Sequence, residues 1–331
     1  MADPAPTRQW RTGGMTPPDE LLADVLPAGK LGPDGRPVRA LRDELRRIPN
    51  VRNALTVAAA WAQIVGVVAA AVWLDHPLAW IAGFLLMGRS FALLAILAHE
   101  AAHRLLFTHR RVNDLVGRWL LAYPAFVAYD VYRRVHMAHH RQEFGPDEPD
   151  MNFYEGFPCG WRSLARKLGR DALGVSGWRN LVPLFRALRS PSSRPTAVSI
   201  LATQAVLLAA ATAAGRPELY LFYWLLPWMT VWRVLNRLRS IAEHGGLERS
   251  SDRRRTTHHV RQSLLPRFWF VPYRTGWHLA HHVDSGIPFR SLPRLQDELD
   301  RVGYTDDALT WPSYTALWKA LATGRPDRVT A

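Results

Sequence analysis

Histidines are the residues of this chain whose spacing points most directly to chemistry. Nine of the 13 histidines fall in or near three short segments: HEAAH (99–103), HMAHH (136–140) and HLAHH (278–282), with His244 ahead of the last. Within each segment, every histidine is three or four residues away from another histidine of the same segment. Residues at these spacings share one face of an α-helix, so each segment would project its imidazoles in one direction. Clusters of this kind indicate metal coordination.

The number of histidines predicts two metal ions rather than one. A zinc site takes three or four protein ligands, so nine imidazoles suit two ions that each bind four or five. Imidazole binds zinc, copper, iron and nickel, and ligand type alone does not choose among them. The single cysteine, Cys159, excludes an internal disulfide and any site built from several thiolates.

A zinc protease is an alternative, because HEAAH also satisfies the H-E-x-x-H motif with Glu100 as the general base. Such a site would need only one further ligand. The two HxxHH segments would then have no role, which makes an intramembrane zinc protease a remote alternative. A membrane metal carrier or receptor is a further one, but it would place its ligands inside the spans.

Four apolar runs must position these histidines. They cover about residues 54–74, 78–98, 196–214 and 219–235, and short polar turns join them in two pairs. A 21-residue helix is about 30 Å long, which matches the hydrocarbon core of a bilayer. The runs therefore predict four transmembrane helices in two hairpins, with HEAAH at the end of the second. Buried core helices of a soluble protein are the alternative.

Charge placement predicts the orientation of these spans. The net charge is +14, and all Lys and Arg residues except Arg89, Arg216 and Arg233 precede the first span, lie between the hairpins or follow the fourth span. Positive charge marks cytoplasmic segments. Both termini and the metal site are thus expected to be cytoplasmic, in a bacterial plasma membrane. No nucleic-acid-binding motif accompanies the charge.

The segments around the spans complete the predicted organisation. Residues 1–50 form a cytosolic, partly disordered N-terminal segment without a signal peptide, and residues 311–331 form a C-terminal cytosolic tail. The stretches 161–168 and 178–188 are amphipathic and basic, which is typical of helices on a membrane surface or of a solvated face. Four histidines are expected to bind no metal: His76, His109, His258 and His259, the last two in a solvated basic patch.

The three histidine segments and their order around two hairpins resemble the membrane-bound fatty acid desaturases, a group that also includes hydroxylases and ketolases. The resemblance covers roughly residues 51–310. It implies an all-α polytopic membrane protein with four transmembrane helices and a helical cytosolic cap that holds a diiron site. By resemblance, the iron ligands are His99, His103, His136, His139, His140, His244, His278, His281 and His282. Some members have an Asn one turn before the residue matching His244, where this chain has Ser240, with Asn236 a turn earlier.

The resemblance also implies the activity. Desaturases of this family use two iron ions and O2 to remove hydrogens from an unactivated methylene of a fatty acyl chain, in the synthesis of unsaturated fatty acids. The acyl chain would belong to a lipid, an acyl-CoA or an acyl carrier protein. The alternative is a hydroxylase or ketolase of an acyl, alkyl or carotenoid substrate.

Two further expectations concern the surroundings of the irons. Imidazoles are neutral, so nearby acidic residues should orient them, and by sequence proximity Glu243, Asp130 and Asp284 are the candidates. Electrons must come from a separate donor of the ferredoxin or cytochrome b5 type with its reductase, because EHGG (243–246) is not a haem-binding HPGG motif. The basic cytoplasmic surface suits an acidic donor.

Overall fold

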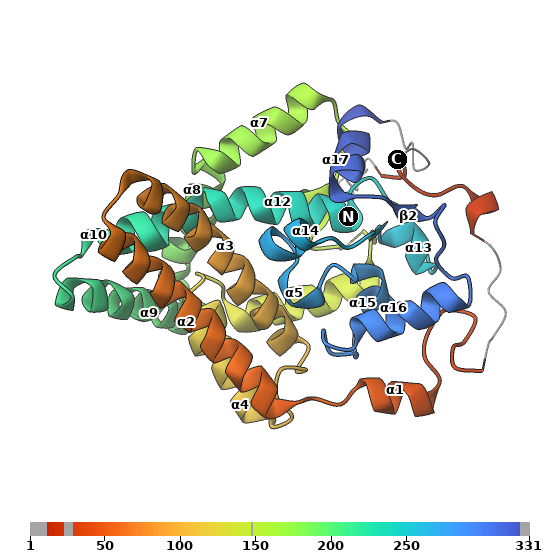
Figure 1. Ribbon diagram of the computed structural model, residues 1–331, viewed down its shortest axis with the longest axis horizontal. Coiled ribbons are helices and arrows are strands. Elements are labelled where there is room, and N and C mark those ends of the chain that lie inside the picture. Colours follow the sequence, from red (N-terminus) through yellow and green to blue (C-terminus); the bar gives the residue numbers. More distant parts are fainter. Residues whose placement is uncertain (1–11, 23–28, 147, 325–331) are drawn as a thin grey trace, which may run out of the picture.

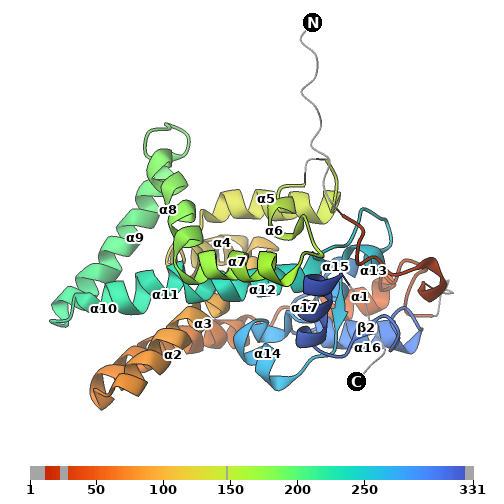
Figure 2. The same ribbon diagram turned by 90° about the horizontal axis from the view of Figure 1, so that it is seen from above.

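The computed structural model describes residues 12–22, 29–146 and 148–324. Residues 1–11 and 23–28, which belong to the N-terminal segment predicted to be partly disordered, lie outside these ranges. Within the described ranges the fold is mostly helical, as predicted, and the named strands are the two-residue β1 (His259–Val260) and β2 (Thr310–Trp311), which pair in parallel. The long apolar helices extend from one end of the molecule, and the short C-terminal helices form the other end (Figure 1, Figure 2).

Three helices are long and apolar enough to cross a membrane: α2 (Asn50–Leu74), α3 (Pro77–Ala102) and α9 (Arg194–Ala213). Helices α2 and α3 contact each other and are joined by a short turn, at which Asp75 is in the left-handed conformation (φ 43°). Of the most apolar part of each helix, 67% is buried in α3 but only 22% in α2 and 17% in α9. Helix α3 is therefore the central helix, and α2 and α9 expose apolar side chains at the periphery.

The predicted fourth span, residues 219–235, is not one continuous helix. It comprises α10 (Glu218–Tyr220), a π-helical segment η3 (Leu221–Leu225), α11 (Leu226–Met229) and the start of α12 (Val231–His244), with a break at Thr230. Pro227 lies at the start of α11 and cannot donate a backbone hydrogen bond, which favours an irregular helix at this point. The hydropathy of the sequence identifies this apolar stretch, but it does not show that the stretch is divided into several helical segments.

Helix α12 connects the membrane helices to the histidine-rich region. It packs closely on α3, where a Cβ at Gly88 would lie 2.3 Å from the Val231 side chain. Helices α6 (Met151–Tyr154) and α7 (Trp161–Ala172) contact α12, and α8 (Val175–Ala187) contacts α11. Helix α4 (Arg110–Val116), the π-helical η2 (Gly117–Ala122) and α5 (Tyr129–Gln142) contact α3. The amphipathic stretches predicted at 161–168 and 178–188 are thus helical.

The remaining helices of the described residues are η1 (Asp19–Leu21), α1 (Arg39–Leu45), α13 (Arg253–Thr256), α14 (Leu264–Trp269), η4 (Pro272–Arg274), α15 (His278–Val283), α16 (Leu292–Arg301) and α17 (Tyr314–Thr323). Helix α1 buries Leu41 and Leu45 against α15 and α16. Helix α17 buries Leu317 and Leu321 in a second cluster together with α12. The segment expected to be a C-terminal tail therefore contributes a helix to the core.

Candidate metal centre

Five histidines from three helices converge at the end of α3. His99 and His103 come from α3 and its C-cap, His136 and His140 from α5, and His281 from α15. One ring nitrogen from each lies within 4.8 Å of the others. The Nε2 atoms of His103 and His136 are 2.8 Å apart, and that of His140 is 3.1 Å from those of both His136 and His281. We call this set the five-histidine cluster.

The other four predicted histidines form a second cluster beside the first. His139 comes from α5, His244 from the end of α12, and His278 and His282 from α15. The Nε2 atom of His278 is 3.1 Å from those of both His244 and His282, and a nitrogen of His139 lies within 4.8 Å of those of His244 and His282. This set is the four-histidine cluster.

The spacing of these nitrogens fits metal binding better than hydrogen bonding. Two nitrogens that both accept cannot bond to each other, but nitrogens about 2.1 Å from a common ion are about 3.0–3.4 Å apart. Both ring nitrogens of His99 are buried without a hydrogen-bond partner, as is Oε2 of Glu143. A buried polar atom without a partner is costly, and a metal ion would supply one for His99. The donor set therefore fits two ions.

Burial keeps most of these imidazoles in the neutral form that binds metals. It lowers the pKa of His103 to about 3. Burial, reinforced by charge repulsion from neighbouring groups, also holds well below the usual range the pKa values of His136, His140, His244, His278, His281 and His282. At His139, burial acts in the same direction, but the hydrogen bond and charge of Glu148 outweigh it and raise the pKa.

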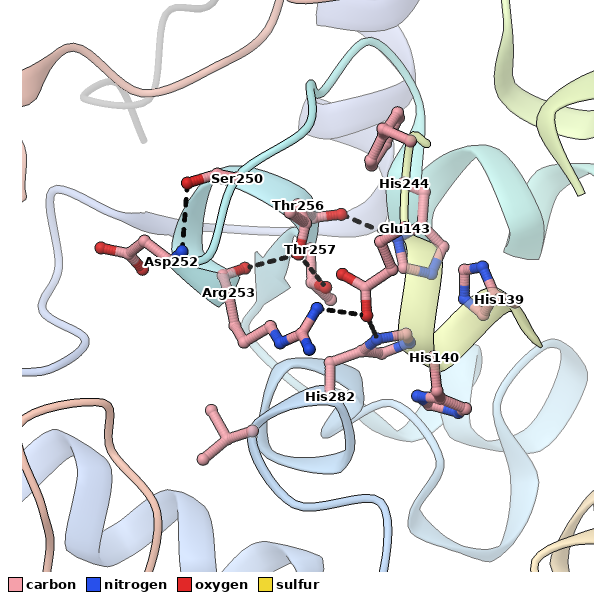
Figure 3. Close-up of polar contacts among 12 residues, drawn as sticks. His139, His140, Glu143, His244, Ser250, Asp252, Arg253, Thr256, Thr257 and His282 are labelled. Atoms are coloured by element: carbon pink, nitrogen blue, oxygen red, sulfur yellow. Dashed lines mark hydrogen bonds and ion pairs between the residues drawn. The ribbon is translucent and has the colours of Figure 1, made fainter. Parts of the chain in front are cut away.

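The members of the four-histidine cluster are oriented through their second ring nitrogen, as Figure 3 shows for His244 and His282. Nδ1 of His139 donates to Glu148 (3.0 Å), that of His282 to Glu143, and that of His244 to the backbone oxygen of Thr256 (2.7 Å). Nδ1 of His278 lies 3.5 Å from Glu243. A carboxylate or a carbonyl can only accept, so the proton is on Nδ1 and the lone pair of Nε2 points into the cluster.

Two of these carboxylates are themselves held by several donors. Oε1 of Glu143 also accepts from the Arg253 guanidinium group (2.7 Å), as Figure 3 shows. The Glu148 side chain is fully buried and accepts from the backbone nitrogens of Phe144 (3.2 Å) and Asp150 (3.1 Å). Such support fixes the imidazoles before any ion binds.

The three acidic residues expected to orient imidazoles have different outcomes. Glu243 lies 3.5 Å from Nδ1 of His278 and also accepts a hydrogen bond from Arg239 (2.8 Å). Asp130 does not take that role: Arg118 binds it through two hydrogen bonds (2.8 and 3.0 Å), and its side chain is 43% exposed. Asp284 binds Arg42 of α1 and the Gly286 backbone nitrogen. The contact between Asp284 and Arg42 therefore links α1 to the end of α15.

Sequence reasoning missed Glu143 and Glu148. Both follow HMAHH closely, and Glu143 is one helical turn after His139. A search for carboxylates one turn beyond a metal-binding segment would have found Glu143. Its contact with His282, 139 positions along the chain, depends on the tertiary fold.

The four histidines set aside from the sequence lie outside both clusters. His76 and His109 are exposed and accept backbone hydrogen bonds at the starts of α3 and α4. The solvated patch expected at His258 and His259 is wrong for His258, which is 4% exposed. Its ring bonds to Gly245 and receives the indole N–H of Trp311.

Glu100 is not arranged as the general base of a protease. Its buried carboxylate accepts a hydrogen bond from the backbone nitrogen of Phe289 (3.1 Å). His99 and His103 lie together with three further imidazoles, more than such a zinc site requires.

A cavity of about 540 Å³ adjoins both clusters. His136, His139, His244 and His278 form part of its lining. Much of the rest is apolar and comes from Ala95, Ala98, Phe126, Val127, Val131, Val135, Trp228 and Trp232. Its volume lies within the range of ligand-binding pockets, about 300–1,000 Å³.

Comparison with known proteins agrees with this geometry. Residues 75–314 match the family model described as fatty acid desaturase. The chain is 27% identical to the dihydrorhizobitoxine desaturase of Bradyrhizobium elkanii over 80% of both chains. It is 29% identical to the beta-carotene ketolase of Paracoccus sp. (strain N81106 / MBIC 01143) over 68% of this chain and 82% of the ketolase. The chain therefore belongs to the fatty acid desaturase family, a group of membrane oxidoreductases.

Proposed function

We propose that the protein is an O2-dependent diiron desaturase that introduces a double bond into a fatty acyl chain. The observation that carries this proposal is the pair of imidazole clusters at the wall of a largely apolar cavity. The five-histidine cluster would hold one iron ion and the four-histidine cluster the other. When bound, the two ions supply the oxidising chemistry that O2 requires to attack an unactivated C–H bond.

The side chains of the protein perform the remaining tasks. Glu143, Glu148 and Glu243 orient the imidazoles of the four-histidine cluster. The apolar residues around Trp228 and Trp232 exclude water from the chain of the substrate. Burial of seven of the nine histidines limits access of solvent to the metal site.

Lipid analysis tests the reaction. The chain is expressed in a bacterial host with a ferredoxin and its reductase, and membrane lipids are profiled by mass spectrometry. We expect acyl chains two hydrogen atoms lighter, and no such product from H139A or H281A, each of which removes one imidazole from a cluster. Unchanged lipids from a protein that carries two iron ions would argue against acyl desaturation.

Hydroxylation or ketolation is the second candidate, and the similarity to a carotene ketolase favours it specifically. The same metal centre could serve either reaction, because the outcome depends on where the substrate carbon lies. A hydroxylated product is one oxygen atom heavier, so the same experiment distinguishes the reactions. Iron content is measured on the purified protein, and one zinc ion without iron would contradict the diiron proposal.

The membrane arrangement is part of the proposal. Helices α2, α3 and α9 and the segmented path 219–235 would make four crossings, with both termini and the metal centre in the cytoplasm of a bacterium. A second cavity, about 640 Å³, reaches His103, His140 and His282 and is lined by Arg36, Arg42 and Arg253. The net positive charge of the chain, +14, favours an acidic ferredoxin-type or cytochrome b5-type donor with its own reductase.

A further inference from the structure

Arg233 lines the large cavity beside the histidine clusters, and no acidic side chain in the described part of the chain forms an ion pair with it. Its Nε donates to the backbone oxygen of Trp228 (3.1 Å), and its guanidinium carbon lies 4.0 Å from the centre of the Trp228 ring. Asp171, whose charge acts on Arg233, is already bound by Arg237 and Ser176. The outer edge of the Arg233 guanidinium is thus left for an acceptor in the cavity.

Arg233 and His244 lie on the same side of α12. They are 11 residues apart, which gives a net rotation of about 20° and a rise of about 16 Å along the helix. Asn236, Arg239 and Ser240 lie between them and line the same cavity, and Arg239, unlike Arg233, is paired with a carboxylate, that of Glu243 (2.8 Å). The cavity wall therefore has a cationic group at one end and a metal-binding histidine at the other.

The surroundings of Arg233 favour an anionic oxygen group as its partner. A cation in a partly apolar cavity is costly without a countercharge. The planar guanidinium stacks on Trp228, which itself is fixed by a hydrogen bond to Ala125 (2.9 Å), so the orientation of the outer edge is set. Such an edge matches the two oxygens of a carboxylate or a phosphate in a bidentate contact.

We propose that Arg233 binds the anionic group of the substrate, a carboxylate or a phosphate, and thereby sets the distance from that group to the reacting bond. The proposal rests on the proposed function, because it assigns this cavity to the substrate. It adds a substrate class, an amphiphile with an anionic end, and a residue that determines specificity.

Binding measurements test this without catalysis. Purified full-length protein in detergent is titrated with radiolabelled hexadecanoic acid, hexadecyl phosphate and hexadecanol. We expect at least one anionic probe to bind about 10- to 100-fold more tightly than the alcohol, and R233Q to abolish that difference while leaving alcohol binding unchanged. The preferred probe distinguishes a carboxylate from a phosphate. Equal affinities of the wild type for all three probes, or R233Q with wild-type anion affinity, would overturn the proposal.

Two further variants control for folding and for charge. R216Q removes one positive charge at the turn before α10, outside the lining of this cavity, and should bind like the wild type. If R233Q fails to fold, R233K is tested instead, because lysine keeps the positive charge but lacks the planar guanidinium group. Weaker anion binding with unchanged alcohol binding is expected for R233K, and unchanged anion binding would contradict the proposal.

The proposal that Arg233 sets the distance from the anionic group to the reacting bond can be tested separately, on protein that is active. For acids or phosphates of different chain length, the double bond should lie at a constant number of carbons from the charged end. A position constant from the methyl end would refute that role. Absence of any product would count against the proposed function and leave the binding result intact.

Discussion

The Glu148 carboxylate offers the sharpest test of how the four-histidine cluster is held. It is fully buried and accepts hydrogen bonds from His139 Nδ1, Phe144 N and Asp150 N. In E148Q the amide must place its NH2 group toward at least one of these donors. At least one buried donor then loses its partner, at a cost of about 1–3 kcal/mol, and His139 loses the charge that orients it.

This loss has a measurable consequence for metal affinity. Removal of a carboxylate that supports a metal-binding histidine typically weakens binding about 10- to 100-fold. We therefore expect E148Q to release one of its two ions at a chelator concentration about 10- to 100-fold lower than the wild type. The other ion, in the five-histidine cluster, should be retained. The assay is dialysis against a graded chelator series, followed by measurement of iron per chain by mass spectrometry.

Asp130 provides the matched control, since it lies on the same helix as His139 but is bound by Arg118 instead of a histidine. D130N should retain both ions like the wild type. If E148Q holds both ions as firmly as the wild type, or D130N loses one equally readily, the assignment of Glu148 as the support of His139 is wrong.

Two other substitutions test the centre and the packing around it. H244A should leave about one ion per chain, whereas H109A, outside both clusters, should keep two; equal loss from both variants would contradict the ligand assignment. G88A should lower the thermal unfolding midpoint, because its Cβ would meet Val231 at 2.3 Å and overpacking costs about 1–3 kcal/mol. G66A, with no atom within 4 Å of the new Cβ, is the control in the same unfolding measurement, and a larger shift for it would refute the packing argument.

The histidine segments could be predicted because their signal is local. Spacings of three and four residues imply a shared helical face, and His136 and His140 do meet. The division into two clusters could not be predicted in this way. His139 and His140 are neighbours, yet adjacent helical residues point about 100° apart, so they enter different clusters. Which cluster each one joins depends on how α5 and α15 pack.

The membrane helices show a similar limit. Three of the four predicted apolar runs correspond to α2, α3 and α9, which are long and apolar enough to cross a membrane. Hydropathy does not predict the π-helical turn before Pro227 or the break at Thr230, because these depend on backbone hydrogen bonds. Glu143 and Glu148 escaped prediction since acidic loop residues usually face solvent, and only the fold places them against imidazoles.

The unequal support of the two clusters has a consequence for how the protein matures. Three carboxylates lie against the imidazoles of the four-histidine cluster, whereas the metal-binding group formed by the other five histidines contains no acidic residue among those that the structure describes. A divalent ion entering the first of these sites meets imidazoles already held by carboxylates; one entering the second meets imidazoles to which no carboxylate of the described residues is hydrogen-bonded. Loading should therefore be sequential, and under iron scarcity a half-filled, inactive form would accumulate with its ion in the four-histidine cluster.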